Sequence, residues 1–106
     1  MSSPSLSKPL DRLGDHRIEA MEWSADGNDF LLQLVSPNPD EKVRLRFVWA
    51  THVSIQLEFG DYSGMPLLFG AEAVPIGDGY RVELQCGVAP EGTITLKCKD
   101  IQRGHV

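Results

Sequence analysis

The sequence predicts an all-β fold in a single domain: an antiparallel β-sandwich, or one strongly curved sheet, of six to seven strands. Two observations predict it. Apolar side chains recur at every second position over most of the chain, and clusters of Gly, Pro, Asn and Asp separate these stretches at short intervals. Strict alternation buries one face of a strand and leaves the other in water. The 106 residues suffice for one hydrophobic core, so we expect one domain.

The β-domain is expected to span residues 15–106. Residues 1–14 are rich in Ser and Pro, and we expect a short flexible N-terminal arm or a helical turn there. Within the first stretch, residues 16–24, Ile18 and Ala20 are out of phase with Met21 and Trp23. A β-bulge near Ala20 would bring both pairs to one face.

The clearest alternation lies in five stretches. The positions expected to face the core are Phe30, Leu32 and Leu34; Val43, Leu45, Phe47 and Trp49; Val53, Ile55, Leu57 and Phe59; Val82, Leu84 and Cys86; and Ile94, Leu96 and Cys98. Residues 49–52 contain no turn-forming residue, so 42–59 is either one long bent strand or two strands with a tight corner. Residues 67–74 end at Pro75, which favours an edge position.

The last two of these stretches form an expected hairpin that bears on the two cysteines. A natural register pairs Cys86 with Ile94, Val82 with Cys98, and Glu83 with Lys97. The two thiols then lie on one face but about 13 Å apart, whereas a disulfide spans at most about 7 Å between Cα atoms. We therefore expect two buried free thiols, as in a reducing compartment, and a cytoplasmic location.

Composition narrows the classes of partner. The chain has 15 acidic and 10 basic residues, for a formal net charge of −5. An acidic chain without clustered Lys and Arg is not typical of nucleic-acid binding, but it is compatible with a basic protein partner. No apolar run is long enough to span a bilayer, so we expect no membrane association.

Residues with catalytic or metal-binding chemistry form no recognisable motif. His16, His52 and His105 are not at metal-ligand spacing, and no serine or cysteine lies in a known nucleophile context. We therefore expect no metal, no cofactor and no enzymatic activity. The one enzyme alternative combines Asp15 and His16, where an acid neighbours an imidazole, with His52.

The loop at residues 60–66 is the surface most typical of protein contacts. It is bounded by glycine and proline and presents Asp61, Tyr62 and Met65. Tyr is enriched at protein interfaces, and Met adapts to irregular contacts. We expect these three residues to bind a partner.

Five segments carry a resemblance. They are Asp15-His16-Arg17-Ile18, Trp23-Ser24, Leu45-Arg46-Phe47, Val53-Ser54-Ile55, and Ile94-Thr95-Leu96 followed by Ile101. Together they resemble a set of small bacterial β-rich domains, some of which are similar to immunity proteins of polymorphic-toxin systems. The resemblance implies a bacterial protein that protects its cell by binding a toxin, and it implies no catalytic residue.

The sequence therefore favours a non-enzymatic domain that binds a protein partner. One alternative is a small-ligand or carbohydrate-binding module that stacks its ligand on Trp23 or Trp49, although the alternation places Trp49 on the buried face. Another is a structural subunit, or a homo-oligomer, assembled through unpaired edge strands.

Overall fold

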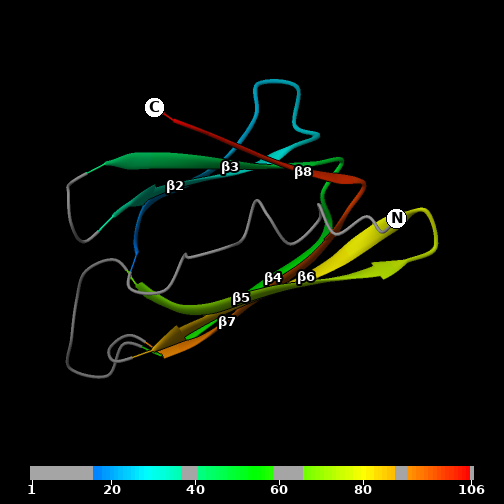
Figure 1. Ribbon diagram of the computed structural model, residues 1–106. Coiled ribbons are helices and arrows are strands. Elements are labelled where there is room, and N and C mark those ends of the chain that lie inside the picture. The colour runs from blue at the N-terminus through cyan, green and yellow to red at the C-terminus, as the bar shows by residue number, and fades with distance from the viewer. Residues whose placement is uncertain (1–15, 37–40, 59–65, 88–90, 106) are drawn as a thin grey trace, which may run out of the picture.

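The computed structural model describes residues 16–36, 41–58, 66–87 and 91–105, and their regular structure is entirely β (Figure 1). There are eight strands in this part of the chain: β1 (Arg17–Trp23), β2 (Phe30–Val35), β3 (Lys42–Val48), β4 (Thr51–Glu58), β5 (Leu67–Ile76), β6 (Gly79–Gly87), β7 (Glu91–Cys98) and β8 (Asp100–His105). These residues include no helix long and apolar enough to cross a membrane. The predicted N-terminal arm or helical turn lies outside the described residues.

The strands form one antiparallel sheet in the order β4-β7-β6-β5-β1-β2-β3-β8. The sheet is not closed, so β4 and β8 are its two edges. The sheet has its shortest strand pairing in the middle, where Leu67 of β5 pairs with Arg17 of β1 and no further pair follows among the described residues. The sheet thus consists of two four-stranded halves. The expected edge position of residues 67–74 is wrong, because β5 lies between β6 and β1 in the sheet order, although Leu67 is its one residue that pairs with β1 among the described residues.

The sheet bends over itself, so that β2, β3 and β8 lie above β4, β5, β6 and β7 (Figure 1). Side chains from the inner faces of both halves form one core cluster. Its largest fully buried members include Phe47, Leu32, Leu84, Ile94 and Leu96. The predicted all-β antiparallel class is confirmed, and the two halves belong to one continuous sheet.

The alternation predicted most of the elements correctly. The register of β1 on β2 shifts between Ile18 and Ala20, which is the predicted bulge. Residues 42–59 contain two strands, β3 and β4, separated by Trp49 and Ala50. The number of strands is eight, where six to seven were expected. The missed strand is β8, whose only large aliphatic residue is Ile101, so its sequence has no apolar period to detect.

The predicted register of the β6–β7 hairpin is wrong by two residues. Leu84 pairs with Ile94 and Val82 with Leu96, so Glu83 lies opposite Thr95, and Lys97 lies opposite Arg81. β7 begins at Glu91, before Ile94, the first residue of the predicted apolar alternation, and it includes Gly92.

Glycine at position 92 has a structural reason. A Cβ atom there would clash with the backbone carbonyl oxygen of Gln56, so glycine allows β4 to approach β7.

Candidate binding surface at the corner and edge of the sheet

The residues that the sequence singled out for partner binding, Asp61, Tyr62 and Met65, lie outside the described residues. The structure therefore does not test the prediction that these three residues bind a partner. A candidate surface has to be built from the remaining strands and their connections.

Two residues of the enzyme alternative are described: His16 immediately precedes β1, and His52 lies on β4. His16 is buried, and its backbone carbonyl accepts a hydrogen bond from the Leu68 amide, so it helps to join β1 to β5. His52 is exposed on β4, and its Nδ1 atom lies 3.1 Å from the hydroxyl of Thr51. Asp15 is not among the described residues. Within the described part of the chain, no three His, Cys, Asp or Glu residues gather to hold a metal ion.

Both cysteines are free and buried, as predicted. Burial raises the pKa of the Cys98 thiol to about 11, and it also raises the pKa of Cys86. A thiol that stays protonated at neutral pH is a poor nucleophile. The two residues therefore act as small apolar side chains in the core.

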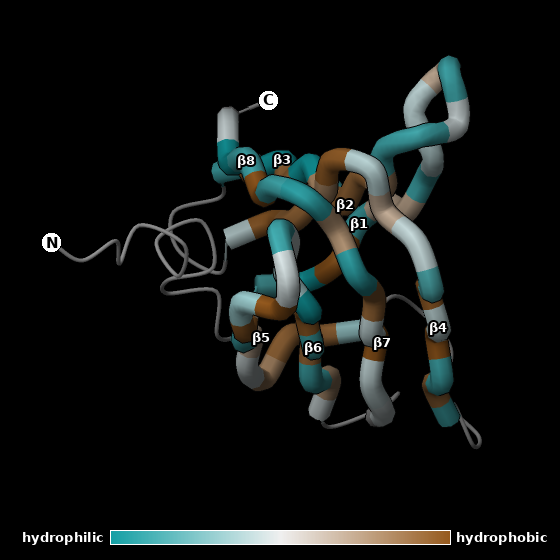
Figure 2. The backbone as a smooth tube through the Cα atoms, turned by 90° about the vertical axis from the view of Figure 1, so that its right-hand side faces the viewer, coloured by the Kyte–Doolittle hydropathy of each residue, from teal (hydrophilic) through white to brown (hydrophobic). Residues whose placement is uncertain are grey.

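The β4 edge, defined here as Thr51–Glu58, has six exposed residues out of eight. It pairs with β7 on one side only and stands at the end of the sheet order (Figure 2). Of its predicted core-facing row, Val53 and Leu57 pack against the core, Ile55 is 45% exposed, and Phe59 lies outside the described residues. An edge strand has no second neighbouring strand to cover its side chains, so the apolar side chains of β4 remain partly exposed to solvent.

The corner between β3 and β4 has an unusual backbone. Trp49 and His52 both have φ of 53°, and they are the non-glycine residues with positive φ in the described part of the chain. Left-handed backbone costs a non-glycine residue roughly 1–2 kcal/mol. Because Trp49 turns the chain out of β3, the alternation ends at Phe47, and Ala50 takes the buried position. The predicted burial of Trp49 is therefore wrong: this indole is 54% exposed.

Hydrogen bonds from three segments hold this corner. The Trp49 amide donates to Oδ1 of Asp29 at 3.1 Å, and the other carboxylate oxygen of Asp29 lies 3.3 Å from the Arg46 guanidinium. The Ala50 amide donates to the carbonyl of Asn28, and the Lys99 amide donates to the carbonyl of Val48. The corner that feeds β4 is thus fixed to the β1–β2 turn and to the β7–β8 connection.

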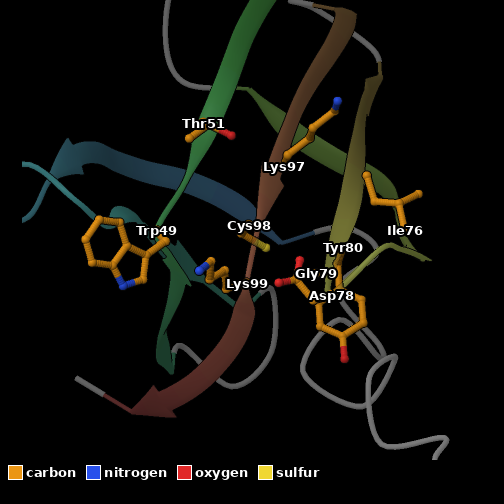
Figure 3. Close-up of a pocket in the computed structure, with 9 residues that line it drawn as sticks. All are labelled: Trp49, Thr51, Ile76, Asp78, Gly79, Tyr80, Lys97, Cys98 and Lys99. Carbon is orange, nitrogen blue, oxygen red and sulfur yellow. The ribbon is translucent and has the colours of Figure 1, made fainter.

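A groove of about 250 Å³ opens beside this corner (Figure 3). Its lining comes from the corner and from the ends of β5, β6 and β7: Trp49, Thr51, Ile76, Asp78, Gly79, Tyr80, Lys97, Cys98 and Lys99. The sequence did not predict this site, since its residues are scattered over fifty positions of chain. The exposed Trp49 is the residue that sequence reasoning had named as a stacking platform and then assigned to the core.

No protein-family model, curated protein or solved structure matches this chain. What the candidate surface does must therefore be argued from its geometry.

Proposed function

We propose that this chain is a non-enzymatic binding domain whose β4 edge pairs with an extended segment of a partner protein. The observation that carries the proposal is the exposure of β4. The strand is eight residues long, contains no proline and has one acidic residue, Glu58. Among the described residues, no strand pairs with its outer side. An added strand could bond there, which is a recurring way for a protein to bind a peptide.

The side chains of β4 support the same mode. Natural edge strands usually carry charges or proline that discourage pairing with another chain. The core-facing row of β4 has neither, and Ile55 at its centre is 45% exposed. An apolar side chain from a partner strand would cover Ile55 and remove that surface from water, at roughly 25 cal/mol per Å² buried.

For the partner, we propose a toxin, with this chain acting as its immunity protein in the bacterial cytoplasm. The resemblance to immunity proteins supports this identity, and the net charge of −5 favours a basic partner. The two unpaired cysteines suit a reducing compartment.

The test compares two variants that place a lysine on opposite edges. Ile55→Lys puts a charge at the centre of β4, where the side chain is already half in solvent. Gln102→Lys puts the same charge on exposed β8. Toxicity protection and complex formation should be measured with the neighbouring gene products co-expressed.

We expect Ile55→Lys to weaken complex formation at least roughly tenfold and to lose protection, while Gln102→Lys keeps both. Absence of any complex with the unmodified chain contradicts the proposal, as does equal loss in both variants. Light scattering separates one further outcome. A dimer of the unmodified chain that dissociates in Ile55→Lys would mean that β4 binds a second copy, and it would overturn the proposal of a foreign partner.

A further inference from the structure

The groove beside Trp49 combines an aromatic wall with cationic side chains. In Figure 3, the indole of Trp49 lies on one side, Tyr80 lies on the other, and the Lys99 side chain lies between them. Lys97 extends from the neighbouring strand above them. Near the centre, the Asp78 carboxylate lies between Lys99 and Tyr80, and the ammonium group of Lys97 points away from both rings. Lys99 is therefore the cationic side chain next to Trp49.

The size of the groove sets the size of its ligand. Sites for drug-sized ligands usually measure about 300–1,000 Å³, and this groove measures about 250 Å³. It has room for one ring with a short substituent.

The charges of the groove favour an anion. The lining of the groove contains two lysines, Lys97 and Lys99, and one acidic residue, Asp78, and neither lysine forms an ion pair within the described part of the chain. Arg81 lies directly opposite Lys97 on β6 and adds positive charge next to the groove. This local excess of cations contrasts with the chain's net charge of −5.

The position of Trp49 is an independent observation. A tryptophan with φ of 53° is strained, yet the Asp29 and Asn28 hydrogen bonds hold this corner in place. Backbone strain in a tightly held residue is concentrated at binding and catalytic sites. Here the strained backbone presents a large aromatic side chain to solvent at the wall of a groove, instead of burying it.

We infer that this groove binds a small aromatic carboxylate: a single ring carrying one short acidic side chain. The ring would pack against Trp49, and the carboxylate would accept hydrogen bonds from the ammonium group of Lys99, with Lys97 adding positive charge nearby. This binding requires no protein partner, so the failure of either proposal would leave the other unaffected.

The test uses Trp49 fluorescence in a Trp23→Phe background, which leaves one tryptophan. Phenylacetate is titrated against phenylacetamide, which has the same ring without the charge. We expect a saturable change in emission with phenylacetate, and binding of the amide weaker by roughly tenfold. Both probes absorb alike, so the amide also controls for optical artefacts.

Two double variants sharpen the assignment. Lys97→Gln with Lys99→Gln should remove the preference for the acid over the amide. Lys42→Gln with Arg44→Gln removes the same charge from exposed positions on β3 and should keep that preference. Equal urea midpoints would show that each variant is folded. The inference is overturned if emission does not change up to about 10 mM phenylacetate, where even a millimolar site is filled. It is also overturned if acid and amide bind equally to the unmodified groove.

Discussion

The two edges of the sheet, β4 and β8, differ in what faces the core and what faces solvent. On β8, Ile101 is 5% exposed, and the strand pairs with β3 over its whole length. Asp100 and Arg103 put charges of both signs on this edge. On β4, the equivalent core-facing residue, Ile55, is 45% exposed, and its register on β7 is interrupted near the corner. The core-facing aliphatic residue of β8 is thus buried, whereas that of β4 leaves apolar surface in solvent.

The largest expected effect tests this contrast directly. Ile101→Ala removes a buried side chain and should lower the free energy of unfolding by about 2–5 kcal/mol. Ile55→Ala should lower it by less than about 1 kcal/mol, because much of that side chain is already in water. Urea denaturation followed by circular dichroism measures both. Equal losses would mean that β4 is as much a part of the core as β8, and that it is not reserved for binding.

The connections that lead into the two edge strands also differ. β8 follows β7 after the single residue Lys99, whereas β4 follows β3 after a strained corner held by Asp29. Asp29→Ala removes the hydrogen bond to the Trp49 amide and the ion pair with Arg46. We expect a loss of about 1.5–3 kcal/mol and a shift in Trp49 emission in the Trp23→Phe background.

The matched control for this prediction is Asp78→Ala, an exposed acidic residue in the β5–β6 turn. It should change the free energy of unfolding by no more than about 0.5 kcal/mol. If the two alanine variants are equally stable, Asp29 does not hold the corner.

The sequence predicted the strands in which apolar residues alternate regularly. It missed the strand whose formation depends on pairing with a neighbouring strand. The alternation in β2, β3, β6 and β7 fixed the class of fold and most of the core. It could not predict β8, since six residues with one aliphatic side chain become a strand only because β3 offers them a partner. Tertiary pairing overrides local pattern in such cases.

The candidate site was hidden for a related reason. The alternation through Phe47 continues to Trp49, and nothing in Trp49-Ala50-Thr51-His52 signals a left-handed turn, because the residues that favour one, Gly and Asn, are absent. The turn is imposed by hydrogen bonds from Asp29 and Asn28, twenty positions away in the chain. A sequence pattern cannot report a backbone conformation that a distant carboxylate stabilises.

The strain at this corner predicts a smaller effect. Trp49→Gly relieves the left-handed backbone, whereas Trp49→Val places a β-branched residue where it is least tolerated. We expect the glycine variant to be more stable than the valine variant by about 1 kcal/mol, after allowing for the greater freedom of glycine in the unfolded chain. Thermal and urea unfolding measure the difference. If valine is equally stable, the backbone of the corner is not strained.

The last effect appears only at alkaline pH and concerns Cys98, the last residue of β7 before the connection to β8. Because burial raises the pKa of this thiol to about 11 in the folded protein, the unfolded chain loses the proton first, near its ordinary value of 9.0. The contribution to stability is therefore complete below pH 9.0 and is lost as the pH rises to about 11. Cys98→Ala should flatten this alkaline fall in the urea midpoint. Cys86→Ala serves as the comparison. Burial also raises the pKa of the Cys86 thiol, but this residue lies at the other end of the β6–β7 hairpin, away from the connection to β8. An unchanged alkaline slope in Cys98→Ala would show that this thiol is as accessible to water in the folded protein as in the unfolded chain.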